Sequence, residues 1–463
     1  MLNSWDEAME WAKKVSQEEN PEESKRRGRK PKGQTKVDQK KTFIQQLKTK
    51  QEERKLKREL GNFYHERAFI AKYREVQNYL LEQSGQSGYF DPTALISLDT
   101  LYYVVFGERS NGKTFAVLVI AFIRYVLYGE KFAYMRRWDI DLTPRRVDTL
   151  FGAFSKFNLI EFITEGEYEF IHTYQRAFYL GRWAQEGEAD VCNATHGGIP
   201  CVREPEPFGF AFALSNMEHD KGGNQPADIT TILFDEFMSR QRYLADELTL
   251  FSNCISSIKR TDGRFKVWML GNTVTTYCPY FREMGLKHIK EMKKGDTQTY
   301  QGSDPSTTIA VHWADSPDGN AKSEINKFFA FDNPRLKMIT EGSFETAEYP
   351  KCPRELDDDH LAFVFFLCFD SDIIQGNIYA YPDGEFIFWN PKTTELKHPD
   401  EDLIYSDQYD YRNNWRSSFK NPQTKEEAAL IELINRDKMF FADNQTGETL
   451  RNFIINSKSI IQR

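Results

Sequence analysis

The spacing of hydrophobic residues divides the chain into an N-terminal extension and two larger regions. Apolar residues are sparse over residues 1–88, where a short amphipathic helix is predicted at 1–20, a charged segment at 21–41 and a helical pattern at 42–82. The sequence SGQSG at 84–88 is typical of a hinge. We therefore predict an extension that ends at residue 88.

Residues 89–275 contain buried-strand runs that alternate with helical stretches. A long apolar helix is predicted at 115–129 and a second helix at 245–259. The strand-like runs lie at 101–106, 131–136, 168–172, 177–180, 208–214, 229–234 and 265–270. Strands that alternate with helices predict an α/β fold with a mainly parallel sheet.

The pattern changes after residue 275. Prolines interrupt residues 276–352, which we interpret as a linker region. Residues 353–463 are rich in strand-like runs and end in helical material. The sequence therefore predicts a second, smaller α/β domain at 353–463.

Composition excludes several classes of protein. Hydrophobic residues make up 40% of the 463 residues and aromatic residues 14%, which is enough for substantial cores. No run approaches the roughly 20 apolar residues that span a bilayer, and the N-terminus is charged rather than signal-like. The six cysteines are too scattered for a disulfide framework and indicate a reducing compartment. We expect a soluble protein with no membrane partner.

The net charge of -8 hides a basic segment. Residues 21–60 hold 15 Lys and Arg against 6 Asp and Glu, a local charge of +9, so the other residues sum to -17. KRRGRKPK at 25–32 resembles an AT-hook, whose extended Arg-Gly-Arg core enters a narrow A·T minor groove. A solvated linker is the alternative, and both interpretations predict salt-sensitive DNA binding. The candidate DNA-binding residues are Arg26, Arg27, Arg29 and Lys30.

A phosphate-binding pattern lies between the first predicted strand and the long helix. GERSNGKT at 107–114 fits G-x-x-x-x-G-K-[ST], in which the lysine reaches the β- and γ-phosphates and the last hydroxyl ligates Mg²⁺. Its glycines let backbone N–H groups face phosphate, and the helix N-terminus adds partial positive charge. A chance match in a glycine-containing turn is the alternative. The candidate nucleotide-binding residues are Gly107, Arg109, Gly112, Lys113 and Thr114.

A second hydrophobic run ends in two adjacent carboxylates. TTILFDEF at 230–237 contains Asp235 and Glu236. In phosphate-loop ATPases, an acid at such a strand end holds Mg²⁺, and an adjacent Glu can polarise the attacking water. A solvated strand end is the alternative. With the loop upstream, the pair predicts an ATPase that uses ATP and Mg²⁺, with Thr114 and Asp235 as metal-binding residues and Glu236 as the catalytic base.

The adjacent Asp–Glu pair indicates the additional-strand catalytic-glutamate class of these ATPases. That class usually inserts a strand between the phosphate-loop strand and the acidic strand, and it tends to place a polar sensor on the next strand. Asn272 follows the run FKVWML at 265–270. It is the candidate catalytic sensor of the γ-phosphate or the lytic water, and a turn residue is the alternative.

From about residue 101 to the C-terminus, the chain resembles the DNA-encapsidation ATPases of small tailed phages with protein-primed linear genomes. The resemblance is carried by VFGERSNGKTFAV, YGEKFAYMRR, ALSNMEHDK, TTILFDEF and VWMLGNTV, and later by AFVFFLCFD and FADNQTGETLRN. It implies a terminase-like motor that couples ATP hydrolysis to translocation of double-stranded DNA into a preformed capsid. The implied partners are DNA and the portal of the procapsid. The implied assembly is a homo-oligomeric ring, a pentamer, in the host cytoplasm during virion assembly.

The resemblance also implies residues that act across the ring. A cation from a neighbouring subunit can stabilise the charge of phosphoryl transfer. The family's trans-acting arginine falls on Arg260, and a lysine of the same interface falls on Lys221. Taken alone, each of these residues would pass as a surface charge.

Residues 353–463 resemble the family's ribonuclease H-like domain, a relic of the nuclease in cutting terminases. Asp370 ends its first predicted strand and Asp443 lies in a late Asp-Asn step, so the two could be part of a two-metal site. The family packages unit-length genomes and has no need to cut DNA. We therefore expect a vestigial domain without nuclease activity.

The chain departs from the family in its first 90 or so residues and in an insertion near 183–207. The insertion contains Cys192, His196 and Cys201, three potential zinc ligands without an obvious fourth, and this favours a polar hairpin over a metal site.

Two other functions stay open. One is a cellular DNA translocase or helicase, and the other is a DNA-tethering scaffold that binds ATP without turnover. The intact pair of Asp235 and Glu236 argues against the scaffold, because a pure binder has no use for the second acid.

Overall fold

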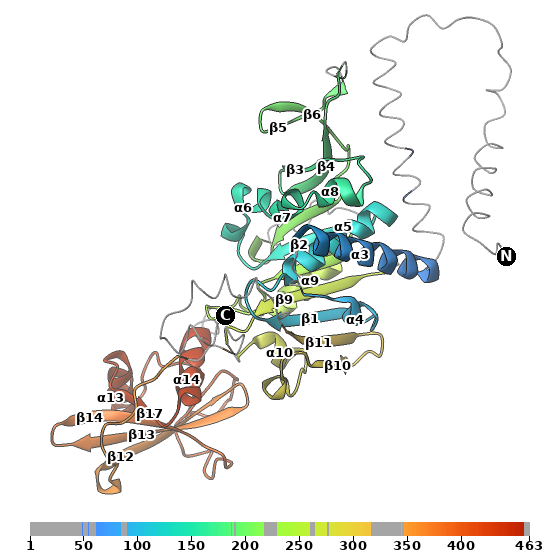
Figure 1. Ribbon diagram of the computed structural model, residues 1–463. Helices are drawn as coiled ribbons and strands as arrows, with labels where there is room; N and C mark the ends of the chain where they lie inside the picture. Colours follow the sequence, from blue (N-terminus) through green and yellow to red (C-terminus); the bar gives the residue numbers. More distant parts are fainter. Residues whose placement is uncertain are drawn as a thin grey trace, which may run out of the picture.

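The computed structural model describes residues 49, 54, 62–84, 90–186, 188, 191–216, 229–259, 264–275, 277–315, 344 and 347–457 (Figure 1). The predicted helix at 1–20 lies outside the described residues. So do the candidate DNA-binding residues Arg26, Arg27, Arg29 and Lys30, and the candidate trans-acting residues Lys221 and Arg260. Of the helical pattern predicted at 42–82, the longest described part is α3 (Asn62–Ser84), a helix of 23 residues.

The first domain, from α3 to β11, is built on an 11-stranded sheet. In sheet order its strands are β10 (Thr297–Gln301), β11 (Thr308–Ala314), β1 (Tyr102–Gly107), β9 (Lys266–Asn272), β8 (Ile229–Asp235), β2 (Lys131–Arg136), β7 (Gly209–Ala213), β4 (Ala177–Trp183), β6 (Ile199–Arg203) and β5 (Ala194–His196), with β3 (Phe170–Tyr174) paired to β4. From β11 to β7 every neighbouring pair is parallel. The pairs at both ends of the sheet are antiparallel. The predicted α/β fold with a mainly parallel sheet is confirmed.

Helices cover both faces of this sheet (Figure 1). They are α4 (Thr93–Ile96), α5 (Lys113–Tyr128), α6 (Pro144–Asp148), α7 (Gly152–Lys156), α8 (Leu159–Ile163), α9 (Glu247–Ile258) and α10 (Pro279–Glu283), with short 3₁₀ turns η1 (Asp139–Leu142), η3 (Leu214–Asn216) and η4 (Ile289–Glu291). Tyr103 and Val105 of β1 belong to one core with α3 and α5, whereas Val104 and Phe106 belong to the opposite core with α9 and α10. A strand buried on both faces reads as a continuous apolar run, which is why the sequence located these strands.

The second domain, from η5 (Asp358–His360) to α14 (Asn444–Ser457), contains a six-stranded sheet. Its strands in sheet order are β16 (Trp415–Arg416), β15 (Ile404–Ser406), β12 (Leu361–Phe369), β13 (Asp372–Tyr381), β14 (Gly384–Pro391) and β17 (Met439–Phe441), and its other helix is α13 (Lys425–Asn435). The hairpins β12–β13 and β13–β14 are antiparallel. The pairs β12–β15, β15–β16 and β14–β17 are parallel.

The predicted linker at 276–352 differs from the structure. β10 and β11 lie within it, and β11 pairs in parallel with β1 over the whole length of that strand. The first sheet therefore continues to Ala314, well past residue 275. The prolines of this segment indicate turns, but the apolar run TIAVHWA at 308–314 forms β11, which pairs with β1 inside the sheet.

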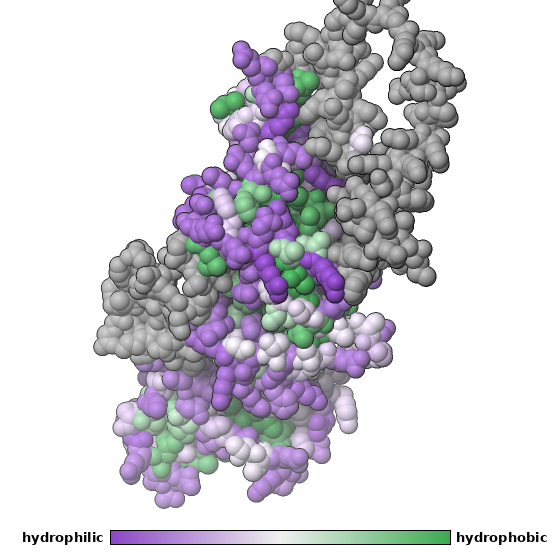
Figure 2. Space-filling view, turned by 45° about the vertical axis from the view of Figure 1, so that its right-hand side comes forward, coloured by the Kyte–Doolittle hydropathy of each residue, from purple (hydrophilic) through white to green (hydrophobic). Residues whose placement is uncertain are grey.

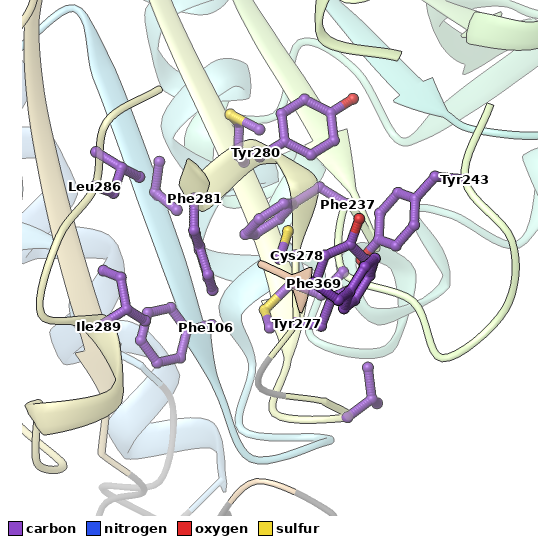
Figure 3. Packing of buried hydrophobic residues seen from close by; sticks show 14 of the residues in the cluster. Phe106, Phe237, Tyr243, Tyr277, Cys278, Tyr280, Phe281, Leu286, Ile289 and Phe369 are labelled. Carbon is purple, nitrogen blue, oxygen red and sulfur yellow. The ribbon is translucent and has the colours of Figure 1, made fainter. Parts of the chain in front are cut away.

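The two domains share one apolar core. A single cluster of buried residues contains Phe106 and Phe281 of the first domain together with Phe365, Leu367 and other core residues of the second. At the junction, the rings of Tyr277 and Phe369 lie with their centroids 4.6 Å apart (Figure 3). Because these side chains are removed from water together, the contact between the domains is stabilised by apolar burial as well as by charge.

The insertion near 183–207 forms the predicted hairpin. β5 and β6 pair in antiparallel around Gly197 and Gly198, both of which have positive φ. Within the described ranges, no group of three or more His, Cys, Asp or Glu side chains is arranged to hold a metal ion. All six cysteines of the chain are free thiols.

The described surface is mostly hydrophilic on the face seen in Figure 2, with small separate hydrophobic areas. Among the described residues, no helix has both the length and the apolar character needed to cross a membrane.

Candidate functional site

A cleft of about 930 Å³ lies at the carboxyl ends of the parallel strands of the first sheet. Ligands bind at this edge in open α/β sheets, because the loops that follow the strands meet there. Seven of the ten candidate nucleotide-binding, metal-binding and catalytic residues of the ATP site line this one cleft: Arg109, Gly112, Lys113, Thr114, Asp235, Glu236 and Asn272. Gly107 ends β1 at the base of the loop.

The loop between β1 and α5 has the backbone shape that its glycines allow. Gly112 has φ of 85° and stands as the N-cap of α5, so the helix begins at Lys113 with its N-terminus facing the cleft. A Cβ on Gly107 would lie 2.5 Å from the carbonyl oxygen of Ala314 in β11, closer than real contacts allow. Glycine at 107 therefore permits β11 to lie against the start of the loop, and glycine at 112 permits the turn into the helix.

Lys113 is buried and surrounded by oxygen acceptors. Its Nζ donates to the carbonyl oxygen of Glu108 at 2.6 Å and to Oδ1 of Asn111 at 3.0 Å, and it lies 3.5 Å from Oδ1 of Asn272. Burial lowers the pKa of Lys113 to about 8, and the charges of Asp235 and Glu108 act in the opposite direction. A phosphate beside this ammonium would favour its charged form.

Asp235 and Thr114 bring two oxygen ligands together. The Thr114 hydroxyl donates to Oδ1 of Asp235 at 3.1 Å, and the Tyr134 hydroxyl donates to Oδ2 at 3.1 Å. Burial raises the pKa of Asp235, while the guanidinium of Arg136 acts to lower it. Hydroxyl and carboxylate oxygens are donors that suit Mg²⁺, which commonly takes few protein ligands and completes its shell with phosphate and water. These two residues fit the predicted metal.

Glu236 occupies a strained position at the edge of the cleft. Its φ is 58°, a conformation that costs a non-glycine residue about 1–3 kcal/mol and that surrounding contacts must hold. Its side chain is 55% exposed, and its Oε2 accepts a hydrogen bond from NH2 of Arg136 at 2.5 Å. Arg136 ends β2, the neighbour of β8, so it lies beside the acidic strand end.

Arg137, the residue that follows β2, fixes the backbone of the acidic loop, by which we mean the loop that begins with Asp235 and Glu236. Arg137 forms a buried ion pair with Glu247 of α9, with Nε 2.8 Å from Oε2. The same guanidinium donates from NH1 to the carbonyl oxygen of Glu236 at 3.3 Å and from NH2 to that of Phe237. Arg136 and Arg137 both lie in the motif YGEKFAYMRR, but the sequence alone predicts no role for either, because their partners are 100 and 110 residues away along the chain.

Asn272 ends β9, which lies between β1 and β8. In register, Asn272 is opposite Gly107 of β1, and Leu270 is opposite Asp235 of β8. The amide therefore stands between the phosphate loop and the acidic strand end. At this position, the Asn272 side chain can contact a ligand that is bound by the phosphate loop and by the acids at the end of β8.

The two carboxylates proposed for the second domain have different surroundings. Asp443 accepts hydrogen bonds from the backbone N–H of Thr446 at 2.7 Å and from its hydroxyl at 2.8 Å, at the start of α14. Burial raises the pKa of Asp370 to about 6, with Asp372 and Asp407 adding to the shift and Lys290 and Arg282 opposing it. Asp407 follows β15, and its charge acts on Asp370. The sequence analysis did not identify Asp407 as a candidate residue of this site.

Comparison with known proteins gives relatives for part of the chain. Residues 84–196 match the podovirus DNA encapsidation protein (Gp16) family. The DNA packaging proteins of Bacillus phages phi29 and PZA are each 26% identical over 201 residues, which cover 42% of this chain and 50% of those proteins. The chain thus spans about half the length of the curated relatives it matches.

Solved structures give weaker likenesses. The bacteriophage Phi-29 viral genome packaging motor assembly matches 79% of this chain and 99% of its own with 20% identity and a TM-score of 0.46. The Phi-28 gp11 DNA packaging motor matches 80% and 98% with 18% identity and a TM-score of 0.44. The sequence matches confirm the resemblance expected from the motifs: over part of its length, this chain is similar to the podovirus DNA encapsidation proteins.

Proposed function

We propose that this protein is the ATPase of a viral DNA packaging motor, which couples ATP hydrolysis to the movement of double-stranded DNA into a preformed capsid. The observation that carries the proposal is the meeting of Lys113, Thr114, Asp235, Glu236 and Asn272 at one cleft. These residues come from three separate places along the chain: the N-terminus of α5, the end of β8 and the end of β9. The relatives are DNA packaging proteins, which supports the same function.

Each residue has a chemical role in ATP hydrolysis. Lys113 exchanges its contacts with Glu108 and Asn111 for the β- and γ-phosphates of ATP. Thr114 and Asp235 would hold Mg²⁺, which when bound would neutralise charge on the phosphates. Glu236 orients the attacking water once its carboxylate leaves Arg136, and Asn272 contacts the γ-phosphate or that water.

The fold classes expected from the sequence are part of this proposal. The position of β9 between β1 and β8 supports the additional-strand catalytic-glutamate class. The strand order β14–β13–β12–β15–β16, with β12, β15 and β16 parallel, supports a ribonuclease H-like second domain. We retain the second domain at 353–463. We extend the ATPase domain, predicted at 89–275, so that it runs from α3 through β11, because Phe69 and Tyr73 of α3 are buried in the same core as β1 and α5. The extension predicted at 1–88 is thereby shortened to the residues before Asn62.

A degenerate nuclease site is also proposed. Arg282 of the first domain forms an ion pair with Asp407, and the Asp443 carboxylate caps α14. Both arrangements occupy carboxylates that a two-metal site would need to keep available for metal ions.

The assembly and partners follow from the proposed motor. Subunits form a ring, a pentamer, on the portal of the procapsid in the host cytoplasm. Arg260, and with it Lys221, completes the neighbouring subunit's site. The basic segment with Arg26, Arg27, Arg29 and Lys30 contacts DNA phosphates and the minor groove.

The deciding experiment measures ATP hydrolysis by the purified full chain, alone, with double-stranded DNA, and with DNA plus empty procapsids. A packaging motor predicts stimulation by DNA and a further increase with procapsids. Stimulation by DNA with no response to procapsids would favour a cellular-type translocase. Binding of Mg-ATP without turnover under any condition would favour the tethering scaffold.

The shared active site has its own test. Mixing Arg260→Ala subunits with Glu236→Gln subunits should restore turnover that neither variant has alone, since one subunit then supplies each missing group. No recovery at any mixing ratio would contradict a trans-acting Arg260.

A further inference from the structure

The loop that carries the two acids runs from the cleft directly into the contact between the domains. After Glu236, residues 238–241 line one wall of the cleft. Within that wall, NH2 of Arg240 lies 2.5 Å from Oε1 of Glu448. Glu448 belongs to α14 of the second domain. One wall of the phosphate cleft is therefore tied to the other domain by an ion pair.

This ion pair is buried and supported by further bonds. The side chains of Arg240 and Glu448 are 12% and 4% exposed. Oε1 of Glu448 also accepts from the backbone N–H of Ala347 at 2.9 Å. NH2 of Arg451, one turn further along α14, donates to the carbonyl oxygen of Arg240 at 3.2 Å. Both the side chain and the backbone of Arg240 are thus held by α14.

The first domain holds the part of the same loop that precedes Arg240, where the N–H of Ser239 donates to the hydroxyl of Tyr243 at 3.0 Å. Glu236 and Phe237 are fixed through their carbonyl oxygens by Arg137, and the N–H of Phe237 donates to the carbonyl of Leu270 at 3.1 Å. Glu236 itself needs such support, because it has positive φ. The acidic loop is consequently held as far as Ser239 by the first domain and at Arg240 by the second.

The opposite wall of the cleft, formed by the phosphate loop, is also connected to the second domain by ion pairs. Nζ of Lys294 lies 2.7 Å from Oε1 of Glu108, the second residue of the phosphate loop. Earlier in the same segment, Lys290 pairs with Asp372 at 3.2 Å, and Arg282 pairs with Asp407. The segment 282–294 therefore joins the phosphate loop to the second domain, as Arg240 joins the acidic loop to it.

We propose that Glu448 is a positioning residue for Glu236, and that through it the second domain controls the rate of the chemical step at the ATP site. The inference rests on the proposed ATPase function. Removing the charge of Glu448 takes this ion pair away from the buried guanidinium of Arg240. The loop then loses its support from α14, and Glu236 spends less time in the geometry that activates water. Reciprocal coupling holds for binding free energies, so an analogue of the transition state bound in the cleft should in turn alter the contact at α14.

The test compares two isosteric substitutions in the full chain. Glu448→Gln removes the charge while keeping an acceptor for Ala347. The matched control is Glu427→Gln: Glu427 pairs with Arg416 at 2.6 Å, with side chains 3% and 12% exposed, and lies in α13 of the same domain. Glu427 likewise accepts a backbone N–H, that of Gln423 at 2.8 Å. The two variants therefore lose equivalent buried charges, one at the cleft and one away from it.

Steady-state kinetics and thermal unfolding are measured for both variants. We expect similar losses of melting temperature, a kcat at least about fivefold lower for Glu448→Gln with KM within about twofold of the parent, and parent-like kinetics for Glu427→Gln. Equal kcat values in the two variants would overturn the proposal, because the Arg240–Glu448 pair would then be merely structural.

A second measurement does not depend on a stable Glu448 variant. Hydrogen exchange of α14 is followed in the parent protein with and without Mg-ADP and aluminium fluoride, which mimic the transition state of phosphoryl transfer. Changed protection at 444–457 supports the coupling, and unchanged protection despite bound analogue overturns it. If calorimetry detects no Mg-ATP binding by the parent protein, the proposed function fails first and the inference fails with it.

Discussion

Two sets of carboxylates stand at strand ends in this molecule, and their surroundings differ. Asp235 and Glu236 end β8 and face a cleft lined by groups of the same domain, including Lys113 and Arg136. Asp370 and Asp407 follow β12 and β15 of the second domain and face cations that come from the first domain. Carboxylates at similar positions in the two sheets therefore face different surroundings: an open cleft in the first domain, and cations from the first domain in the second.

The difference lies in where the opposing cations are anchored. Around Asp235 and Glu236, the cleft of about 930 Å³ separates the phosphate loop from the acidic loop, so a ligand can lie between them. At Asp407, the guanidinium of Arg282 is already in contact, and Lys290 similarly pairs with Asp372. Carboxylates at strand ends therefore indicate a catalytic site only when the groups opposite them leave room for substrate.

The largest expected effect is at the acidic pair of the first domain. Glu236→Gln should lower kcat by about 100-fold or more, since general-base catalysis contributes factors of that size, while Mg-ATP binding persists. Lys113→Ala should abolish both binding and turnover, because its ammonium is the buried cation of the phosphate loop. Turnover assays and calorimetry check these outcomes, and a Glu236→Gln protein with parental kcat would remove Glu236 from the mechanism.

The next effect is a pH dependence of nucleotide affinity. Burial lowers the pKa of Lys113 to about 8, and phosphate favours the protonated form, so binding above pH 8 must take up a proton. Affinity for a non-hydrolysable Mg-ATP analogue should fall as pH rises above 8, by up to about tenfold per unit. Lys113→Arg should lose this slope, because arginine stays charged throughout the range. Calorimetry from pH 7 to 9.5 measures both, and a flat profile for the parent would contradict the assignment.

A smaller effect is expected for stability at the acidic edge of the second domain. The folded-state pKa of Asp370 is raised from 3.8 to about 6, so the folded protein binds more protons than the unfolded chain between these values and stability falls as pH rises through them. Asp370→Asn should therefore raise the free energy of unfolding by about 1–2 kcal/mol at pH 7 and leave it nearly unchanged at pH 4. Asparagine also tolerates the φ of 49° at this turn.

Denaturant unfolding at the two pH values measures the change. A loss of stability at pH 7 would mean that Arg282 and Lys290 stabilise the Asp370 charge by more than its burial costs.

The smallest expected effect is on DNA cleavage. Incubation of the parent protein with double-stranded DNA and Mn²⁺ should give no cleavage, and Asp370→Asn should be indistinguishable from it. Metal-dependent cleavage that Asp370→Asn abolishes would show that the contact of Arg282 with Asp407 opens and exposes an active site.

Much of the first domain and its site could be predicted from the sequence. β1, β8 and β9 read as continuous apolar runs because both faces of a parallel sheet are buried, and the residues at their ends carry recognisable spacing. Lys113, Thr114, Asp235 and Asn272 follow directly from those strand ends. For these residues, local sequence sets both the element and the position within it.

Residues that act through distant partners could not be predicted in the same way. Arg136 reaches Glu236 only because β2 lies beside β8, and Arg240 reaches Glu448 only because α14 packs on the acidic loop. Neither pairing leaves a periodic or spacing signal, since the partners are 100 and 208 residues apart. β11 did leave a signal in its apolar run, but the surrounding prolines suggested a linker.

The parallel pairing of β11 with β1 has a practical consequence for dissecting this protein. A polypeptide truncated at residue 275 would leave the strand that precedes the nucleotide loop as an exposed sheet edge, with unpaired backbone groups and apolar side chains uncovered. Such a fragment would be prone to aggregation, and its failure to hydrolyse ATP would say nothing about the intact chain. Fragments meant to isolate the catalytic half should retain residues through at least Ala314.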